Sequence, residues 1–165
     1  MQMQFMRSKQ RIYLMDNQGI VVKSWECRSD FYEGHNENGQ PRASLPLGDY
    51  WCWAEITNGK YGESYGNFYI TTGDPRGRDI HGGGSGLADP YADYQGWLPT
   101  YGCLRMQNAD GIELSQIIID KGNSMLLEVV EWLYHNFTAL SRKRKEPKEK
   151  EIYNIYIIYI RKRNI

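Results

Sequence analysis

The sequence has few of the residues that build metal sites or disulfide frameworks. Its 165 residues contain three cysteines, Cys27, Cys52 and Cys103, and these form no CxxC pair and no ligand cluster with the three histidines. A zinc site is therefore not expected. The odd count leaves at least one free thiol. Cys27 and Cys52 are either a disulfide of an oxidising compartment or two buried thiols in strands, and the sequence leaves both readings open.

The chain also lacks a net charge, a membrane-length apolar run and a standard export signal. Its 20 basic and 20 acidic side chains balance, so there is no global electrostatic footprint for nucleic acid. No stretch reaches the about 20 apolar residues of a membrane-spanning helix. Residues 1–10 contain no apolar run of signal-peptide length. We expect no nucleic-acid partner and no stable membrane span, while export by another route, a trimmed signal and action inside a cell or phage particle stay open.

Turn-forming and aromatic residues are abundant instead. Seventeen glycines, six prolines, thirteen tyrosines and five tryptophans favour a β-rich or α+β domain. Trp51 and Trp53 alternate with Cys52, which predicts that both indoles share a sheet face and serve the core. The apolar runs and turn signals predict strands at 11–15, 20–25, 50–56 and 67–72, a loop at 28–46 and a hairpin connection at 57–66.

The second half of the chain contains the one predicted helix. Asn108 or Asp110 is expected to cap its start, and Lys121-Gly122 to end it. Residues 124–134 read as a buried strand or a short helix, and their valines favour the strand. We place the folded domain at residues 1–140, followed by a charged linker and an Ile/Tyr-rich tail of unknown role at residues 141–165.

Residues 73–102 form the longest predicted loop, with eight glycines and three prolines. Such a long loop in a compact domain is often functional. Its His81-Gly82-Gly83-Gly84 run lets the backbone approach a neighbour closely, but it lacks the Gly-Lys-Ser/Thr of a phosphate loop. Tyr91, Tyr94 and Trp97 either form a lid over a site or pack the loop against the sheet.

A Cys–His pair carries the candidate chemistry. His81 precedes Cys103 by 22 residues, and an imidazole can take the proton of a thiol and later return it to a leaving group. Backbone N–H groups at Gly102 and Cys103 are candidate oxyanion donors. Arg105 either holds a substrate carboxylate or makes a structural salt bridge. The other candidate substrate-binding residues, which line the pocket or support the loop, are Thr100, Tyr101 and Gly82.

These motifs resemble the L,D-transpeptidase catalytic domain, the YkuD-like family, over roughly residues 10–132. The family has a His-Gly element, a variable loop and Ser/Thr-x-Gly-Cys followed by an apolar residue and Arg or Asn, which here are His81-Gly82 and Thr100-Tyr101-Gly102-Cys103-Leu104-Arg105. Pro46-Leu47-Gly48-Asp49-Tyr50 resembles the family's Pro-x-Gly-x-Tyr/Phe turn, and Met106, Asn108 and Asp110 match its continuation into a helix. Many members have His where this chain has Tyr101, a change expected to alter the substrate pocket or an oxyanion contact.

The resemblance implies a mainly β fold, a curved sheet or sandwich with one short helix packed on it. It further implies cross-linking of peptidoglycan stem peptides through a Cys103 thioester to give 3-3 links, no metal or organic cofactor, and a place in the bacterial cell envelope or periplasm. One alternative is an L,D-carboxypeptidase or wall-degrading hydrolase that uses the same site. Another is a catalytically silent wall-binding module.

Overall fold

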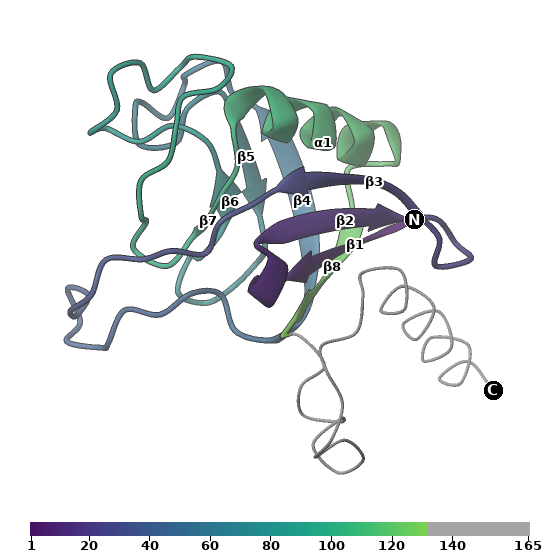
Figure 1. The fold of residues 1–165 in the computed structure, drawn as a ribbon, viewed down its shortest axis with the longest axis horizontal. Coiled ribbons are helices and arrows are strands. Elements are labelled where there is room, and N and C mark those ends of the chain that lie inside the picture. The colour runs from purple at the N-terminus through teal and green to yellow at the C-terminus, as the bar shows by residue number, and fades with distance from the viewer. Residues whose placement is uncertain (132–165) are drawn as a thin grey trace, which may run out of the picture.

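A computed structural model describes residues 1–131, which form one curled, mixed β-sheet with a single α-helix packed on it (Figure 1). The order of strands across the sheet is β3-β2-β1-β8-β4-β5-β6-β7. The pairs β1–β8 and β6–β7 are parallel, and the remaining neighbours are antiparallel. The elements are β1 (Gln2–Met6), the 3-10 turn η1 (Arg7–Lys9), β2 (Arg11–Met15), β3 (Val21–Glu26), β4 (Gly48–Ile56), β5 (Phe68–Thr71), β6 (Ile80–His81), β7 (Leu104–Arg105), α1 (Asn108–Asp120) and β8 (Met125–Val130). The prediction of a mainly β fold with one short helix packed on it is confirmed.

Strand β8 lies at the centre of the sheet although it comes last in the described chain. It pairs in parallel with β1 and in antiparallel fashion with β4, so it joins the N-terminal strands to those that carry the candidate site. The strand reading of this segment is confirmed for residues 125–130. The rest of that segment, the domain boundary at residue 140 and the predicted tail at 141–165 lie outside the described residues.

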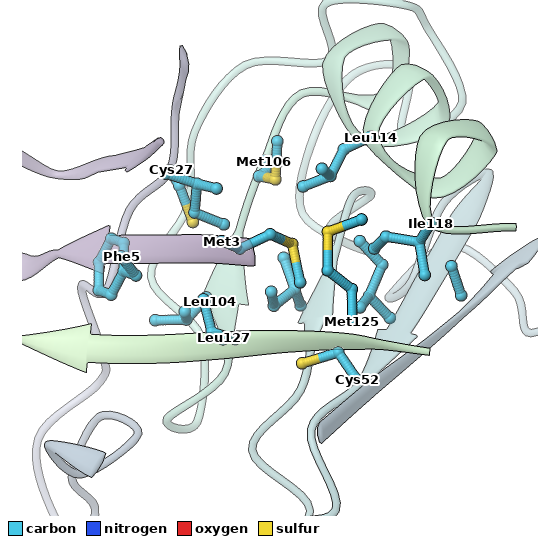
Figure 2. Close-up of a cluster of buried hydrophobic side chains, with 14 of the residues drawn as sticks. Met3, Phe5, Cys27, Cys52, Leu104, Met106, Leu114, Ile118, Met125 and Leu127 are labelled. Carbon is cyan, nitrogen blue, oxygen red and sulfur yellow. The ribbon is translucent and has the colours of Figure 1, made fainter. Parts of the chain in front are cut away.

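The hydrophobic core fills the space between the sheet and α1, as Figure 2 shows. Phe5 and Leu127 from the central strands and Leu104 from β7 are fully buried there, and Leu114 and Ile118 of α1 are buried on the helix side of the same cluster. Burial of each such side chain is worth about 1.5–3 kcal/mol. Because Leu104 belongs to this core, the strand after Cys103 is fixed by the same packing that stabilises the domain.

The two tryptophans of β4 face away from the core, so the prediction that they serve it is wrong. Trp51 and Trp53 are 59% and 47% exposed, whereas Cys52 and Ala54 are buried. Strand alternation puts both indoles on one face, as expected, but does not say which face. Helix α1 lies over β4 and β5 on the opposite face, and the short side chains of Cys52 and Ala54 let it pack closely there.

The start of α1 is held by the long loop and not by a local cap. Gln107 occupies the N-cap position without a side-chain cap bond, so the prediction of a cap by Asn108 or Asp110 is wrong. The Gln95 side chain accepts a hydrogen bond from the Asn108 backbone N–H at 2.7 Å, which satisfies one of the free donors at a helix start. The predicted end is confirmed, because α1 stops at Asp120 and Gly122 takes a positive φ of 92°.

The cysteines are separate thiols. Cys27 and Cys52 are buried and free, while Cys103 is partly exposed. Of the two readings that the sequence left open, the structure therefore has the buried thiols, although Cys27 lies just after β3 and not within a strand. Burial raises the pKa of Cys27 well above its usual value and raises the pKa of Cys52 to about 12.

Of the helical segments in residues 1–131, none has the length and apolar character of a membrane span.

Candidate active site

Two short strands inside and after the long loop bring the predicted nucleophile and base to one face. Strand β6 pairs with β7 in parallel, with Ile80 opposite Leu104 and His81 opposite Arg105. Ile80 and Leu104 are fully buried in the core. Because side chains alternate along a strand, His81 and Arg105 project to the other face, and so does Cys103, which directly precedes β7. Cys103 and His81 therefore share a face and lie diagonally across the ladder, because Cys103 is two residues before Arg105, the partner of His81.

His81 is held as a neutral base. Its side chain is buried, and its Nδ1 lies 2.8 Å from the Gly82 carbonyl oxygen. Because a carbonyl only accepts, Nδ1 carries the proton and Nε2 keeps its lone pair in the neutral ring. Burial, and then the positive charge of Arg105, lower the pKa of His81 to about 4. At neutral pH the imidazole is thus uncharged and able to accept a proton.

Cys103 is a free thiol on the same face as His81. Its Sγ donates a weak hydrogen bond to the Gly77 carbonyl at 3.6 Å. Burial, and to a smaller extent the charge of Asp79, raise the pKa of Cys103, whereas a hydrogen bond from the Asp79 backbone amide and the charges of Arg105 and Arg78 oppose this rise. The resting pair is therefore a thiol and a neutral imidazole, so the proton must move as the sulfur attacks.

Thr100 and Gly102 shape the turn that carries Cys103. Thr100 is buried, and its Oγ1 accepts from the Gly102 N–H at 3.0 Å and donates to the Cys103 carbonyl at 2.7 Å. Gly102 has φ of 129°, and a Cβ there would lie 2.5 Å from the Ala43 carbonyl oxygen, so only glycine fits. Thr100 therefore supports the loop and does not line a pocket.

The same contacts change the expected oxyanion donors. The Gly102 N–H is already bonded to Thr100, which argues against its predicted role. The Cys103 N–H, in contrast, makes no hydrogen bond within residues 1–131. Of the two predicted donors, Cys103 is the one left free to face a developing oxyanion.

Arg105 and Gly82 act behind the base. Arg105 is 4% exposed, and its guanidinium donates to the carbonyls of Leu98 at 2.9 Å, Gly82 at 2.8 Å and Gly83. This is neither the substrate contact nor the salt bridge that the sequence suggested. The Gly82 carbonyl accepts from both Arg105 and His81, so the cation fixes the carbonyl that in turn fixes the imidazole.

Tyr101 is the predicted site residue that is open to solvent. It is 69% exposed, its ring centroid lies 5.6 Å from that of Tyr32, and the Arg42 guanidinium lies 4.2 Å from its own centroid. A cleft of about 420 Å³ is lined by Ala43 and Arg78, which both approach Gly102, and by Arg7, Ser29, Phe31, Ser44, Pro46 and Leu47. The position where many members of the resembling family have His, two residues before Cys103 in the chain, thus forms an exposed aromatic wall with Tyr32.

The aromatic residues of the long loop mostly pack it in place. The Arg28 guanidinium lies 4.3 Å from the Trp97 ring centroid, and the Tyr91 ring packs against Gly59 in the β4–β5 connection. Tyr94 is 71% exposed. Trp97 and Tyr91 thus pack the loop in place and do not form a lid, whereas the Tyr94 side chain is largely exposed.

Sequence reasoning missed a buried acid in the site. Asp79 is 4% exposed, and its carboxylate accepts from the Tyr69 hydroxyl and, at 2.7 Å, from the Thr72 backbone N–H. It shares the face of His81 across the buried Ile80. The alternation Asp79-Ile80-His81 was the available signal, hidden by the surrounding glycines.

No protein-family model matches the sequence, and no curated protein is significantly similar to it. Within residues 1–131, no three His, Cys, Asp or Glu side chains group as metal ligands. The chemistry of the site therefore rests on its own residues.

Proposed function

We propose that this protein is a cysteine-dependent L,D-transpeptidase that acts on peptidoglycan stem peptides, with Cys103 as nucleophile and His81 as general base. One observation carries the acyl-transfer chemistry. Cys103 and His81 lie on the same face of the β6–β7 ladder, and the bond from Nδ1 to Gly82 leaves Nε2 of the neutral imidazole free. The choice of peptidoglycan rests on the resemblance of the His-Gly and Thr-x-Gly-Cys-x-Arg motifs.

In the first half-reaction, the Cys103 sulfur attacks the carbonyl that joins the third residue of a tetrapeptide stem to its D-Ala. His81 Nε2 takes the thiol proton as the C–S bond forms. The Cys103 N–H stabilises the tetrahedral oxyanion. The intermediate then collapses, the C–N bond breaks, and the imidazolium gives its proton to the departing D-Ala amine.

In the second half-reaction, the thioester meets an amine from another stem. His81 accepts a proton from the attacking amine, the C–S bond breaks, and the sulfur leaves as the thiolate that regains the proton. The product is a 3-3 cross-link and the free Cys103 thiol. Atoms and charges balance without a metal, an oxidant or an external base.

Hydrolysis at the same site is the second candidate, favoured by the open position of the nucleophile. Cys103 is partly exposed and Tyr101 is 69% exposed, so the described residues leave water a path to the thioester. Water in place of the amine gives an L,D-carboxypeptidase or a wall-degrading hydrolase with the same acyl-enzyme.

Intact-protein mass spectrometry after incubation with a carbapenem tests the proposal. By resemblance to the family, we expect one adduct on the parent protein, none on Cys103→Ala, and slower adduct formation on His81→Asn, which keeps the nucleophile. A folded, reduced parent protein without an adduct would count against the transpeptidase. Product analysis with purified muropeptides then separates the two candidates, because cross-linked dimers form only by transfer.

A further inference from the structure

We propose that Arg42 and Arg76 form a carboxylate-binding site beside Cys103. The identity of its natural ligand, the free C-terminal carboxylate of a stem peptide, rests on the proposed function. Three observations support the site itself. Each guanidinium is held by a backbone carbonyl, both arginines belong to segments next to the Cys103 turn, and neither charge has an ion-pair partner within residues 1–131.

Arg42 is held against the exposed aromatic wall. Its guanidinium carbon lies 4.2 Å from the Tyr101 ring centroid, and Nη1 donates to the Glu33 backbone carbonyl at 3.3 Å. Stacking fixes the plane of the guanidinium, and the single carbonyl contact uses one of its five N–H donors. The remaining donors are oriented next to the residue that precedes Gly102-Cys103.

Arg76 is bonded to the segment that carries Arg42. It is exposed, and its Nη2 donates to the Pro41 backbone carbonyl at 2.9 Å. The next residue, Gly77, accepts the hydrogen bond from Cys103 Sγ. The Arg76 side chain is therefore bonded to the residue before Arg42, and the residue after Arg76 is bonded to the Cys103 thiol.

The segment between them packs directly on the nucleophile turn. A Cβ on Gly102 would lie 2.5 Å from the Ala43 carbonyl and 3.2 Å from the Arg78 side chain. Ala43, the neighbour of Arg42, and Arg78, two residues after Arg76, thus both approach the residue before Cys103. The segments that carry the two arginines therefore lie beside the nucleophile turn.

Their charges are available to a ligand. Asp74, the acid nearest to Arg76 in sequence, is bound by both Nε and Nη2 of Arg78, at 2.8 and 2.7 Å. The ion pairs within residues 1–131 include none that involves Arg42 or Arg76. Two forked, uncompensated cations on one rim match a carboxylate, which accepts paired N–H bonds.

Under the proposed function, this chemistry identifies the part of the substrate that the site holds. The D-Ala that departs from a tetrapeptide stem carries a free carboxylate one residue beyond the attacked carbonyl. A carboxylate held at the rim by Arg42 and Arg76 sets that carbonyl over Cys103, because the two groups are linked by a single residue.

Alkylation of Cys103 by a charged and a neutral reagent tests the site without relying on the proposed reaction. Iodoacetate and iodoacetamide form the same C–S bond and release iodide, but only iodoacetate carries a carboxylate. Cys27 and Cys52 are buried, so intact mass reports Cys103 alone, and Cys103→Ala checks this. The measurement is the iodoacetate-to-iodoacetamide rate ratio in the full chain at low ionic strength.

We expect the ratio to fall about three- to tenfold in the double variant R42Q/R76Q, since each exposed charge pair contributes up to about 1 kcal/mol. Added salt should lower the parent ratio toward that of the variant. Lys121→Gln, which removes one charge at the far end of α1, is the matched control and should keep the parent ratio. Circular dichroism verifies that each variant is folded.

An unchanged ratio in folded R42Q/R76Q would overturn the site, as would a Cys103 that neither reagent reaches in the folded protein. A changed ratio together with no carbapenem adduct would keep the carboxylate site and remove the transpeptidase. Where transfer is observed, a tetrapeptide ending in D-Ala carboxylate should exceed its carboxamide in kcat/KM for the parent but not for R42Q/R76Q. Equal preference in both proteins would overturn the assignment of the ligand.

Discussion

Acid should destabilise this protein through His81. The folded pKa of about 4 lies below the ordinary value of 6.5, so between these values the unfolded chain binds a proton that the folded chain excludes. The contribution of His81 to the free energy of unfolding is therefore fully present above pH 6.5 and is lost as the pH falls toward 4. At about 1.4 kcal/mol per pKa unit, the limiting loss is about 3 kcal/mol. Between pH 7 and pH 5 the expected loss is about 2 kcal/mol.

Urea unfolding at pH 7 and pH 5 measures this loss. The informative variant is His81→Asn, whose amide nitrogen stands near Nδ1 and keeps a donor for the Gly82 carbonyl. It should lose about 2 kcal/mol less than the parent between the two pH values, whatever its stability at pH 7. His35→Asn removes an exposed imidazole and should behave as the parent does. Equal pH dependence in His81→Asn and the parent would refute a buried, neutral His81.

Three further substitutions probe the framework of the site by urea unfolding. Gly102→Ala should cost about 1–3 kcal/mol and slow alkylation of the nucleophile, because its new Cβ meets the Ala43 carbonyl at 2.5 Å. Arg105→Met should cost about 3 kcal/mol, because it removes the guanidinium donor from the Leu98 and Gly83 carbonyls and leaves the Gly82 carbonyl with His81 Nδ1 alone. NMR titration should show a raised His81 pKa, which Arg105→Lys, with its charge kept, should not. Asn108→Ala should cost about 2–4 kcal/mol, since its side chain bonds three backbone groups. A stability within about 0.5 kcal/mol of the parent would contradict any of the three.

The sequence predicted β2 to β5 and β8 but missed β1 and the two-residue strands β6 and β7. Strand β1 shows three consecutive buried residues, Met3, Gln4 and Phe5, because Gln4 donates to Glu128 of its parallel neighbour. A buried glutamine breaks the alternation that reveals a strand. Strands β6 and β7 have too few residues for any period, and only the partner strand defines them.

The candidate nucleophile and base could be predicted because their motif is local, while the roles around them depend on distant contacts. Arg105 could not be assigned to the Gly82 carbonyl from sequence, since the contact spans 23 residues of loop. The cap of α1 comes from Gln95, 13 residues before Asn108. Local rules look for a cap within the first turn, and they have no access to a side chain that returns from a loop.

The central place of β8 has a consequence for how the protein is made. During synthesis, strands β1 to β3 emerge first and can pair as successive antiparallel neighbours, and β4 to β7 emerge later. In the sheet the two sets are joined by β8, and Arg28, just after β3, bridges Arg105 of β7 by two backbone hydrogen bonds. A nascent chain shorter than residue 125 lacks the strand that pairs with both β1 and β4. The core that includes Leu104 is completed only when β8 inserts. The packing around the Cys103 turn is thus finished late in synthesis, once residues 125–130 have been made.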